Sequence, residues 1–259
     1  MTKIILSADS TCDLGDELKA KYQVHYYPFH IILGDKQYQD NVDITPEEIF
    51  QAYWERKILP KTAAIGVGEY LDYFRKWVEN GYQVIHLNLG SGISSAYQNC
   101  CMAARELGNV FPINSGNLSS AIGLLVVEAG KRISQGMPAP QIQKEIRELT
   151  AKCHGSFVLD TLEFLHAGGR CSAVAALGAN LLRLKPCIEV NNRDATMRVG
   201  KKYRGDLDKV LVQYTRDKLM NRDDLNLDRC FLVNAGISKE RLNLVKKTIE
   251  ECADFEHIY

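Results

Sequence analysis

A glycine- and serine-rich loop with the sequence GSGISSAYQ, residues 90–98, follows an apolar run and leads into a segment with helical character. Between a strand and a helix, such a loop can hold a phosphate, carry a nucleophile or bind another oxygen anion. A phosphate loop ends in Gly-Lys-Ser or Gly-Lys-Thr, which is missing here, and a dinucleotide fingerprint has a third glycine where Ser95 stands. The next predicted strand ends in Asn114 instead of an acid, so nucleotide binding has little support.

The same loop comes close to a nucleophile elbow. Residues 92–96 read Gly-Ile-Ser-Ser-Ala, one residue away from the G-x-S-x-G pattern. Asp160 and His166 follow in the order of an α/β-hydrolase, but they lie six residues apart on one segment, and no HGGG-like segment precedes Ser94. A serine hydrolase acting on lipid esters through Ser94 is therefore the alternative function. Capping of the following helix by either serine of the loop is the plain structural explanation.

A neutral anion site is the third possibility. A helix N-terminus offers free N–H groups and a partial positive charge, and a hydroxyl at its cap adds a donor. Further polar loops follow predicted strands at Asp9–Thr11 and Ser115–Ser120, and Thr62 is expected just before a helix. Ligands of open parallel sheets collect outside the carboxyl ends of the strands. Although each loop alone is typical of a cap or turn, together they predict one polar site that takes a carboxylate without a lysine or arginine.

The alternation of strand and helix patterns predicts an α/β fold with a doubly wound parallel sheet over residues 1–150. Predicted strands lie at 3–8, 82–89 and 109–115, and predicted helices at 44–57, 68–81, 94–108, 118–136 and 139–153. From residue 151 to 259 the pattern predicts a second, α+β domain with a hairpin at 185–204 and a strand at 229–237. The second domain looks one strand short at its C-terminal end.

Composition narrows the class of protein. Lys+Arg and Asp+Glu residues number 32 each, so no basic field favours nucleic acid or an anionic membrane. No apolar run reaches the ~18 residues of a membrane span, and no signal peptide is recognisable. The eight cysteines form no C-x-x-C pair, which predicts reduced, mostly buried thiols in a cytoplasmic protein without a metal site or cofactor. A helix dipole acting on Cys12 is the less favoured alternative to simple burial.

Five segments together resemble the DegV family of bacterial fatty-acid-binding proteins. They are DSTCDL (9–14), YQDNVDITPEEIF (38–50), GSGISSAYQ (90–98), DTLEFLHAGGR (160–170) and LLRLKPCIEV (181–190). The resemblance implies two domains that hold one long-chain fatty acid in a tunnel between them. It also implies a non-enzymatic, lipid-presenting subunit of a fatty acid kinase, whose separate catalytic subunit converts the bound carboxylate into an acyl phosphate for phospholipid synthesis.

The resemblance also implies ligand-binding residues. Thr62 occupies the first place of the family's T-S-x-P-S stretch and Ser94 the serine of its S-x-L-S-G-T-Y-Q loop, so both look like donors to the lipid carboxylate. Arg170 closes the family's G-G-R element near the same mouth, and we add Ser115 from the neighbouring polar loop. The family's final strand and its His-Gly-Pro loop have no match before Tyr259.

Two further expectations concern the second domain. The small-residue segment 171–182 is expected to line the acyl chain, with close helix packing as the plainer explanation. The basic residues Arg170, Lys201, Lys202 and Arg204 are expected to meet the kinase or the phosphates of its nucleotide, with a solvated hairpin as the plainer explanation.

Overall fold

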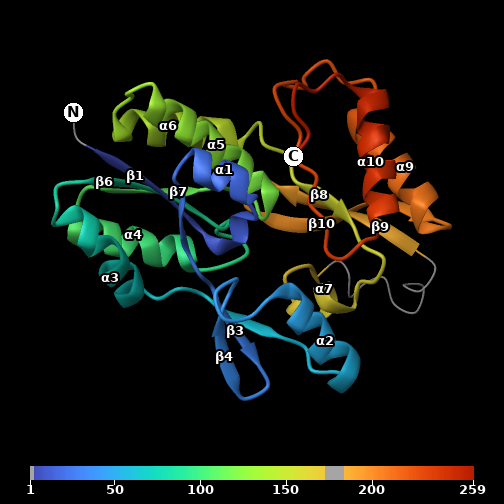
Figure 1. Ribbon diagram of the computed structural model, residues 1–259, viewed down its shortest axis with the longest axis horizontal. Helices are drawn as coiled ribbons and strands as arrows, with labels where there is room; N and C mark the ends of the chain where they lie inside the picture. Colours follow the sequence, from blue (N-terminus) through green and yellow to red (C-terminus); the bar gives the residue numbers. More distant parts are fainter. Residues whose placement is uncertain (1–2, 173–183) are drawn as a thin grey trace. The chain divides into compact units, whose positions relative to one another are not determined.

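The computed structural model of the protein describes residues 3–172 and 184–259 (Figure 1). It contains two compact units, residues 3–155 with 190–196 and residues 156–189 with 197–259. The short segment 190–196 belongs to the first unit, although the sequence pattern places everything after residue 150 in a second domain.

A four-stranded parallel sheet forms the centre of the first unit, in the order β2-β1-β6-β7. The strands are β1 (Ile4–Asp9), β2 (His25–Tyr27), β6 (Gln83–Asn88) and β7 (Val110–Asn114). The central strand β6 is buried from Val84 to Asn88, because helices cover both faces of a parallel sheet. The predicted α/β fold with a parallel sheet is confirmed.

Helices pack on the two faces of this sheet (Figure 1). α3 (Val67–Val78) packs against α4 (Ala96–Leu107), and α5 (Ser120–Ser134) packs against α6 (Ala139–Thr150). The short helices η1 (Ser10–Cys12) and α1 (Asp16–Lys21) follow β1. Two side chains of α6, Gln143 and Arg147, donate hydrogen bonds to the carbonyl of Pro112 in the edge strand β7. These bonds satisfy the carbonyl of Pro112, which on an open edge strand could otherwise pair with a strand of another molecule.

A smaller antiparallel sheet in the order β4-β3-β5 lies in the same unit. It consists of β3 (His30–Leu33), β4 (Lys36–Gln39) and β5 (Lys61–Ala63), and α2 (Pro46–Arg56) contributes Ala52 to its apolar cluster. The helix predicted at 44–57 is confirmed as α2, and its start is fixed by a capping box between Thr45 and Glu48. Thr62, expected just before a helix, lies instead in β5, because pairing with β3 claims this segment and α3 begins only at Val67.

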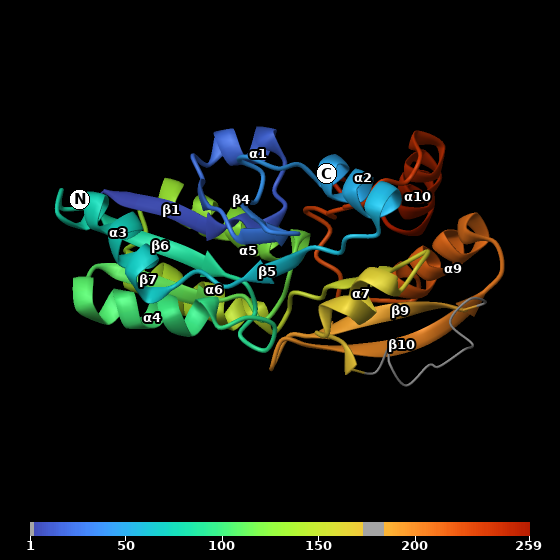
Figure 2. The same cartoon turned by 90° about the horizontal axis from the view of Figure 1, so that it is seen from below.

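The second unit has a three-stranded sheet in the order β10-β9-β8. Its strands β9 and β10 are labelled in Figure 2. Its elements are β8 (Ser156–Val158), α7 (Glu163–Gly168), β9 (Leu184–Asn191), β10 (Thr196–Arg204), α9 (Leu207–Leu219) and α10 (Lys239–Cys252). The predicted hairpin is confirmed. The predicted strand at 229–237 is wrong, because among the described residues the segment forms one isolated bridge, between Cys230 and Ile258, and joins no sheet.

All eight cysteines are free thiols, and five of them are buried. Burial raises the pKa of the Cys12 thiol to about 11, so the dipole alternative is wrong and Cys12 is an inert core thiol. Within residues 3–172 and 184–259, no helix combines the length and apolar character that a membrane crossing requires.

The raised pKa of Cys12 predicts a loss of stability in base. The unfolded thiol ionises near pH 9 and the folded one near 11, so the stabilisation is complete below pH 9 and is lost as the pH rises towards 11. We expect Cys12 to contribute a decrease of about 1.4 kcal/mol per pH unit to the free energy of unfolding over this range. Urea unfolding under reducing conditions at pH 8, 9 and 10 measures it. An equally steep decrease in Cys12→Ala would contradict the assignment.

Candidate functional site

The candidate site lies at the carboxyl edge of the parallel sheet. The chain runs outward from β1 to β2 on one side of the sheet and to β6 on the other side. The loops that leave β1 and β6 therefore diverge, and such a switch point is where open α/β sheets bind ligands. The two loops are Ser10–Cys12 and the glycine- and serine-rich segment 89–95.

A buried carboxylate at the end of β1 fixes the start of the second loop. Asp9 is fully buried, and its Oδ2 accepts a hydrogen bond of 2.8 Å from the backbone N–H of Leu89. Its Oδ1 accepts from the hydroxyl of Tyr70 at 2.8 Å and pairs with Nε2 of His86 at 3.0 Å. Burial raises the pKa of Tyr70 well above its ordinary value, so this hydroxyl stays protonated and donates. The network is a structural anchor that the sequence pattern did not reveal.

The next residues of the loop form a tight turn. The N–H of Gly90 donates to the carbonyl of Asn117 at 2.9 Å, and the carbonyl of Gly90 accepts from Ile93 at 2.9 Å and from Ser94 at 3.3 Å. Gly92 lies against the hairpin segment 190–196, where an added Cβ would stand 2.1 Å from the carbonyl oxygen of Asp194. The hairpin tip therefore rests on the backbone of this loop.

Ser94 leads into α4 with a hydroxyl that can donate. The side chain is half-buried, and its Oγ accepts a hydrogen bond of 3.2 Å from the N–H of Ala96. Since this bond uses an oxygen lone pair, the hydroxyl hydrogen stays available to a ligand. Among the described residues, no acceptor meets the N–H groups of Ser95, Tyr97 and Gln98 at the start of the helix. These neutral donors can hold an oxygen anion.

The structure brings the strand of Thr62 towards α4. Thr62 lies opposite Ile31 in β5 with an exposed side chain. Asn99 of α4 donates through Nδ2 to the carbonyl of Ile65 at 2.8 Å, only three residues after Thr62. Three residues of chain span at most about 10 Å, so Thr62 lies close to the first turns of α4. Asn99 is a positioning contact that the sequence pattern did not single out.

The sequence model of the DegV family, described as a family of uncharacterised proteins, matches residues 2–258. The chain belongs to the DegV family. A DegV domain-containing protein of Clostridium acetobutylicum is 31% identical over 255 residues, which cover 97% of this chain and 89% of the relative. Like the family model, this match covers almost the whole chain.

Solved structures share the fold. A stearic acid-binding protein from Eubacterium ventriosum superimposes with a TM-score of 0.80 at 27% identity, over 96% of this chain and 88% of that one. A fatty-acid-binding DegV protein from Thermus thermophilus gives a TM-score of 0.81 at 24% identity, over 99% and 91% of the two chains. The DegV fold, assigned from the sequence by resemblance, is thereby confirmed.

The other two predicted ligand residues of the DegV protein differ in their surroundings. Ser115 is fully buried, and its hydroxyl donates to the carbonyl of Asn117 at 3.1 Å and accepts from its N–H at 3.2 Å. Ser115 therefore orders its own loop, and we give it no ligand contact. Arg170 is exposed in the second unit and donates to the carbonyl of Gly168 at 2.7 Å. Most of segment 171–182, from residue 173 onward, lies outside the described residues.

The serine hydrolase alternative gains no support from the geometry. A hydrolase nucleophile sits on a strained turn, whereas Ser94 is not among the described residues with a positive φ. The carboxylate of Asp160 pairs with Lys185, and within the described chain no hydrogen bond joins Asp160 to His166. The two residues therefore do not form the acid–histidine half of a triad.

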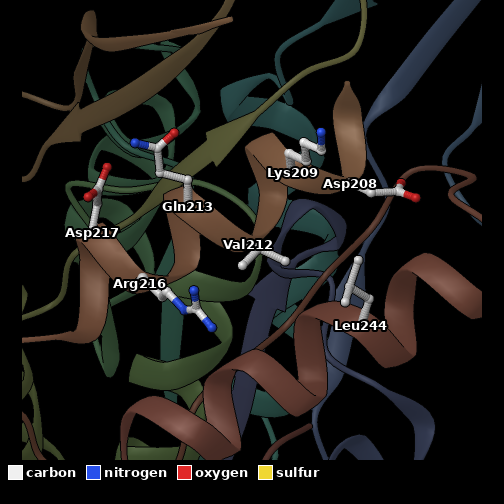
Figure 3. Close-up of a pocket in the computed structure, with 7 residues that line it drawn as sticks. All are labelled: Asp208, Lys209, Val212, Gln213, Arg216, Asp217 and Leu244. Atoms are coloured by element: carbon white, nitrogen blue, oxygen red, sulfur yellow. The ribbon is translucent and has the colours of Figure 1, made fainter. Parts of the chain in front are cut away.

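A groove of about 480 Å³ lies between α9 and α10 (Figure 3). Val212 and Leu244 are its only apolar lining residues among the seven described. The charged residues on its rim are largely paired, for example Asp208 with Arg241 and Arg216 with Glu251. Five of its seven lining residues are polar or charged, so the groove offers an acyl chain no continuous apolar slot.

Ser119, at the start of α5, adopts a strained backbone conformation with φ 54° and ψ −141°. Its hydroxyl donates to Oδ2 of Asp13 at 2.6 Å, which offsets part of the strain. We expect Ser119→Ala to lower the free energy of unfolding by about 1–2 kcal/mol, because it loses the bond and keeps the strain. Ser119→Gly loses the bond but relieves the strain, so it should unfold close to wild type in urea. Equal destabilisation by both substitutions would contradict a strained Ser119.

Proposed function

We propose that this DegV protein binds one long-chain fatty acid and presents its carboxylate to a separate kinase. The observation that carries the proposal is the uncharged donor set formed by the Ser94 hydroxyl and the free N–H groups of α4. The stearic acid-binding relative from Eubacterium ventriosum, with the same fold, supports a lipid acid as the ligand. Thr62 is the second hydroxyl that we assign to the carboxylate.

The two ends of the ligand contribute differently to binding. A tail of ~16 carbons gains roughly 0.8 kcal/mol per buried methylene, on the order of 10 kcal/mol before association costs. The tail therefore supplies the affinity, and the head group needs only to be oriented. Fatty-acid binding consequently requires no basic residue at the head, which agrees with the residues around Ser94.

Neutral donors also suit a carboxylate that must react. A salt bridge would stabilise the carboxylate and lower its nucleophilicity, whereas hydroxyl and N–H donors position it and leave one oxygen free to attack. In the proposed reaction, that oxygen attacks the terminal phosphorus of ATP on the kinase, the bond to ADP breaks, and the acyl phosphate forms. The DegV chain contributes positioning, and the chemistry belongs to the kinase.

The basic residues of the second unit are the proposed kinase contact. Arg170, Lys202 and Arg204 have exposed side chains, and the neighbouring Lys201 pairs with Asp217. Reversal of charge in Arg204→Glu is expected to weaken acyl-phosphate formation with the kinase and to leave fatty-acid affinity unchanged. Full kinase coupling in this variant would remove Arg204 from the proposed contact.

Mass spectrometry of a solvent extract of the purified protein tests the proposal. We expect one fatty acid per chain, no labelling of Ser94 by a fluorophosphonate, and no thermal stabilisation by ATP or NAD. Covalent labelling of Ser94 would favour the lipid esterase instead. Protein that neither carries a fatty acid nor binds added palmitate would contradict the proposed function.

A further inference from the structure

The carboxylate of Glu69, in the first turn of α3, joins this helix to the antiparallel sheet that carries Thr62. Its Oε2 accepts a hydrogen bond of 2.7 Å from the N–H of Gly66, the N-cap residue of α3. Its Oε1 lies 2.6 Å from Nε2 of His30, the first residue of β3. The two oxygens of one side chain therefore hold a helix end and a strand at the same time.

The partners of His30 determine which of its ring nitrogens carries the proton. An ionised carboxylate can only accept a hydrogen bond, so Nε2 of His30 donates to Glu69. Nδ1 lies 3.0 Å from Nε2 of Gln37 in β4 and accepts from this amide. The side chain of His30 is 14% exposed, and a neutral ring satisfies both partners. The orientation of the ring is thereby fixed.

The pair of Glu69 and His30 lies directly beside Thr62 in the sheet. Ala63, the residue after Thr62, is paired with His30 across β5 and β3. Through His30, Glu69 holds the strand of Thr62, and through its other oxygen it holds Gly66, only four residues after Thr62. The short connection between β5 and α3 is therefore tied to α3 at both of its ends.

The same connection is also tied to α4, the helix that follows Ser94. Asn99 of α4 donates to the carbonyl of Ile65 at 2.8 Å, and α3 packs against α4. Thr62 and Ser94 lie far apart in the sequence, so the spacing of their hydroxyls depends on contacts of this kind. Glu69 supplies two of these contacts with a single side chain.

From this geometry we infer that Glu69, with its partner His30, is a positioning residue that holds the Thr62 hydroxyl at the distance from Ser94 that a fatty-acid carboxylate requires. The inference rests on the proposed function. Neither Glu69 nor His30 is assigned a contact with the ligand, because both act through the strand pair β3 and β5. Donors that are already in place need not be ordered when the ligand binds, so the pair raises the affinity.

Variants of His30 separate the tie to β3 from the cap of α3. His30→Ala removes the donor to Glu69 and leaves the N–H of Gly66 bound to the other oxygen. His30→Gln again offers one donor and one acceptor, so it should keep the tie. Glu69→Ala removes the tie and the cap together. Glu48→Ala is the control, because the exposed Glu48 caps α2 in the same way, through the N–H of Thr45 at 2.7 Å.

The measurement is the palmitate affinity of delipidated protein, by competition with a fluorescent fatty acid, with and without the additional substitution Thr62→Ala. We expect His30→Ala to lower the affinity about fivefold and Glu69→Ala about five- to tenfold. His30→Gln and Glu48→Ala should stay within about twofold of wild type. Combined with Thr62→Ala, both His30→Ala and Glu69→Ala should lower the affinity by less than a further factor of about two, because the hydroxyl that they position is gone.

Undiminished losses in combination with Thr62→Ala would overturn the inference, because the effect would then not pass through the Thr62 hydroxyl. A loss in His30→Gln as large as in His30→Ala would overturn it as well, and so would wild-type affinity in both His30→Ala and Glu69→Ala. Wild-type protein that does not bind palmitate would instead overturn the proposed function on which the inference rests.

Discussion

Replacement of Ser94 by alanine is expected to lower palmitate affinity by about ten- to a hundredfold, because a hydrogen bond to a charged group contributes roughly 1.5–3 kcal/mol. Thr62→Ala is expected to lower it by a similar factor. Hexadecanol affinity should fall less, since an alcohol forms weaker hydrogen bonds than a carboxylate. Isothermal titration of delipidated protein measures the palmitate affinity, and acyl-phosphate formation with the kinase reports the positioning.

A matched control is Ser134→Ala, because the Ser134 hydroxyl donates only to the carbonyl of Gly130 within α5. This variant should bind palmitate like wild type. Unchanged palmitate binding and unchanged acyl-phosphate formation in both Ser94→Ala and Thr62→Ala would reject the assignment of these two donors.

A second large effect is expected at Gly92, where the hairpin tip meets the loop. A Cβ at this position would stand 2.1 Å from the carbonyl oxygen of Asp194. Because the atoms it meets are backbone atoms of the hairpin and not a flexible side chain, they have little room to move away. Gly92→Ala is therefore expected to lower the free energy of unfolding by about 3 kcal/mol. The displaced loop should also lower palmitate affinity, because it carries Ser94. Urea unfolding and palmitate titration of the same preparation measure both.

Gly68→Ala in α3 is the matched control, because the same substitution is expected to raise the free energy of unfolding there. An added Cβ meets nothing within 4 Å there, so the substitution is expected to stabilise the protein by up to about 1 kcal/mol through helix propensity. Gly92→Ala with wild-type stability would show that the hairpin tip does not rest on the loop backbone as described.

Local signals explain why much of the fold was predictable. The capping box at Thr45 fixes the start of α2, and the apolar run at 84–89 fixes a buried central strand. The strands β1, β6 and β7 are neighbours in one parallel sheet, so the polar loops that follow them lie at the same edge of that sheet. The sequence could therefore place the serine-rich loop at the carboxyl edge of the sheet.

Features that depend on distant pairing were not predictable from the sequence. Thr62 lies in a strand because β3, some thirty residues earlier, pairs with it. The segment at 229–237 has strand-forming residues, but its backbone bonds within the described chain join Cys230 and Leu232 to His257 and Tyr259 and not to a sheet strand. The contacts of Asp9 and Asn99 join residues far apart in sequence, and only the fold reveals them.

A crystal structure of the protein with bound palmitate tests the central claim most directly. The account predicts one palmitate per chain, with a carboxylate oxygen at about 2.5–3.0 Å from the Ser94 hydroxyl and the second hydroxyl contact from Thr62. A palmitate whose carboxylate lies away from the N-terminus of α4, held by a lysine or arginine instead of hydroxyl and N–H groups, would contradict it.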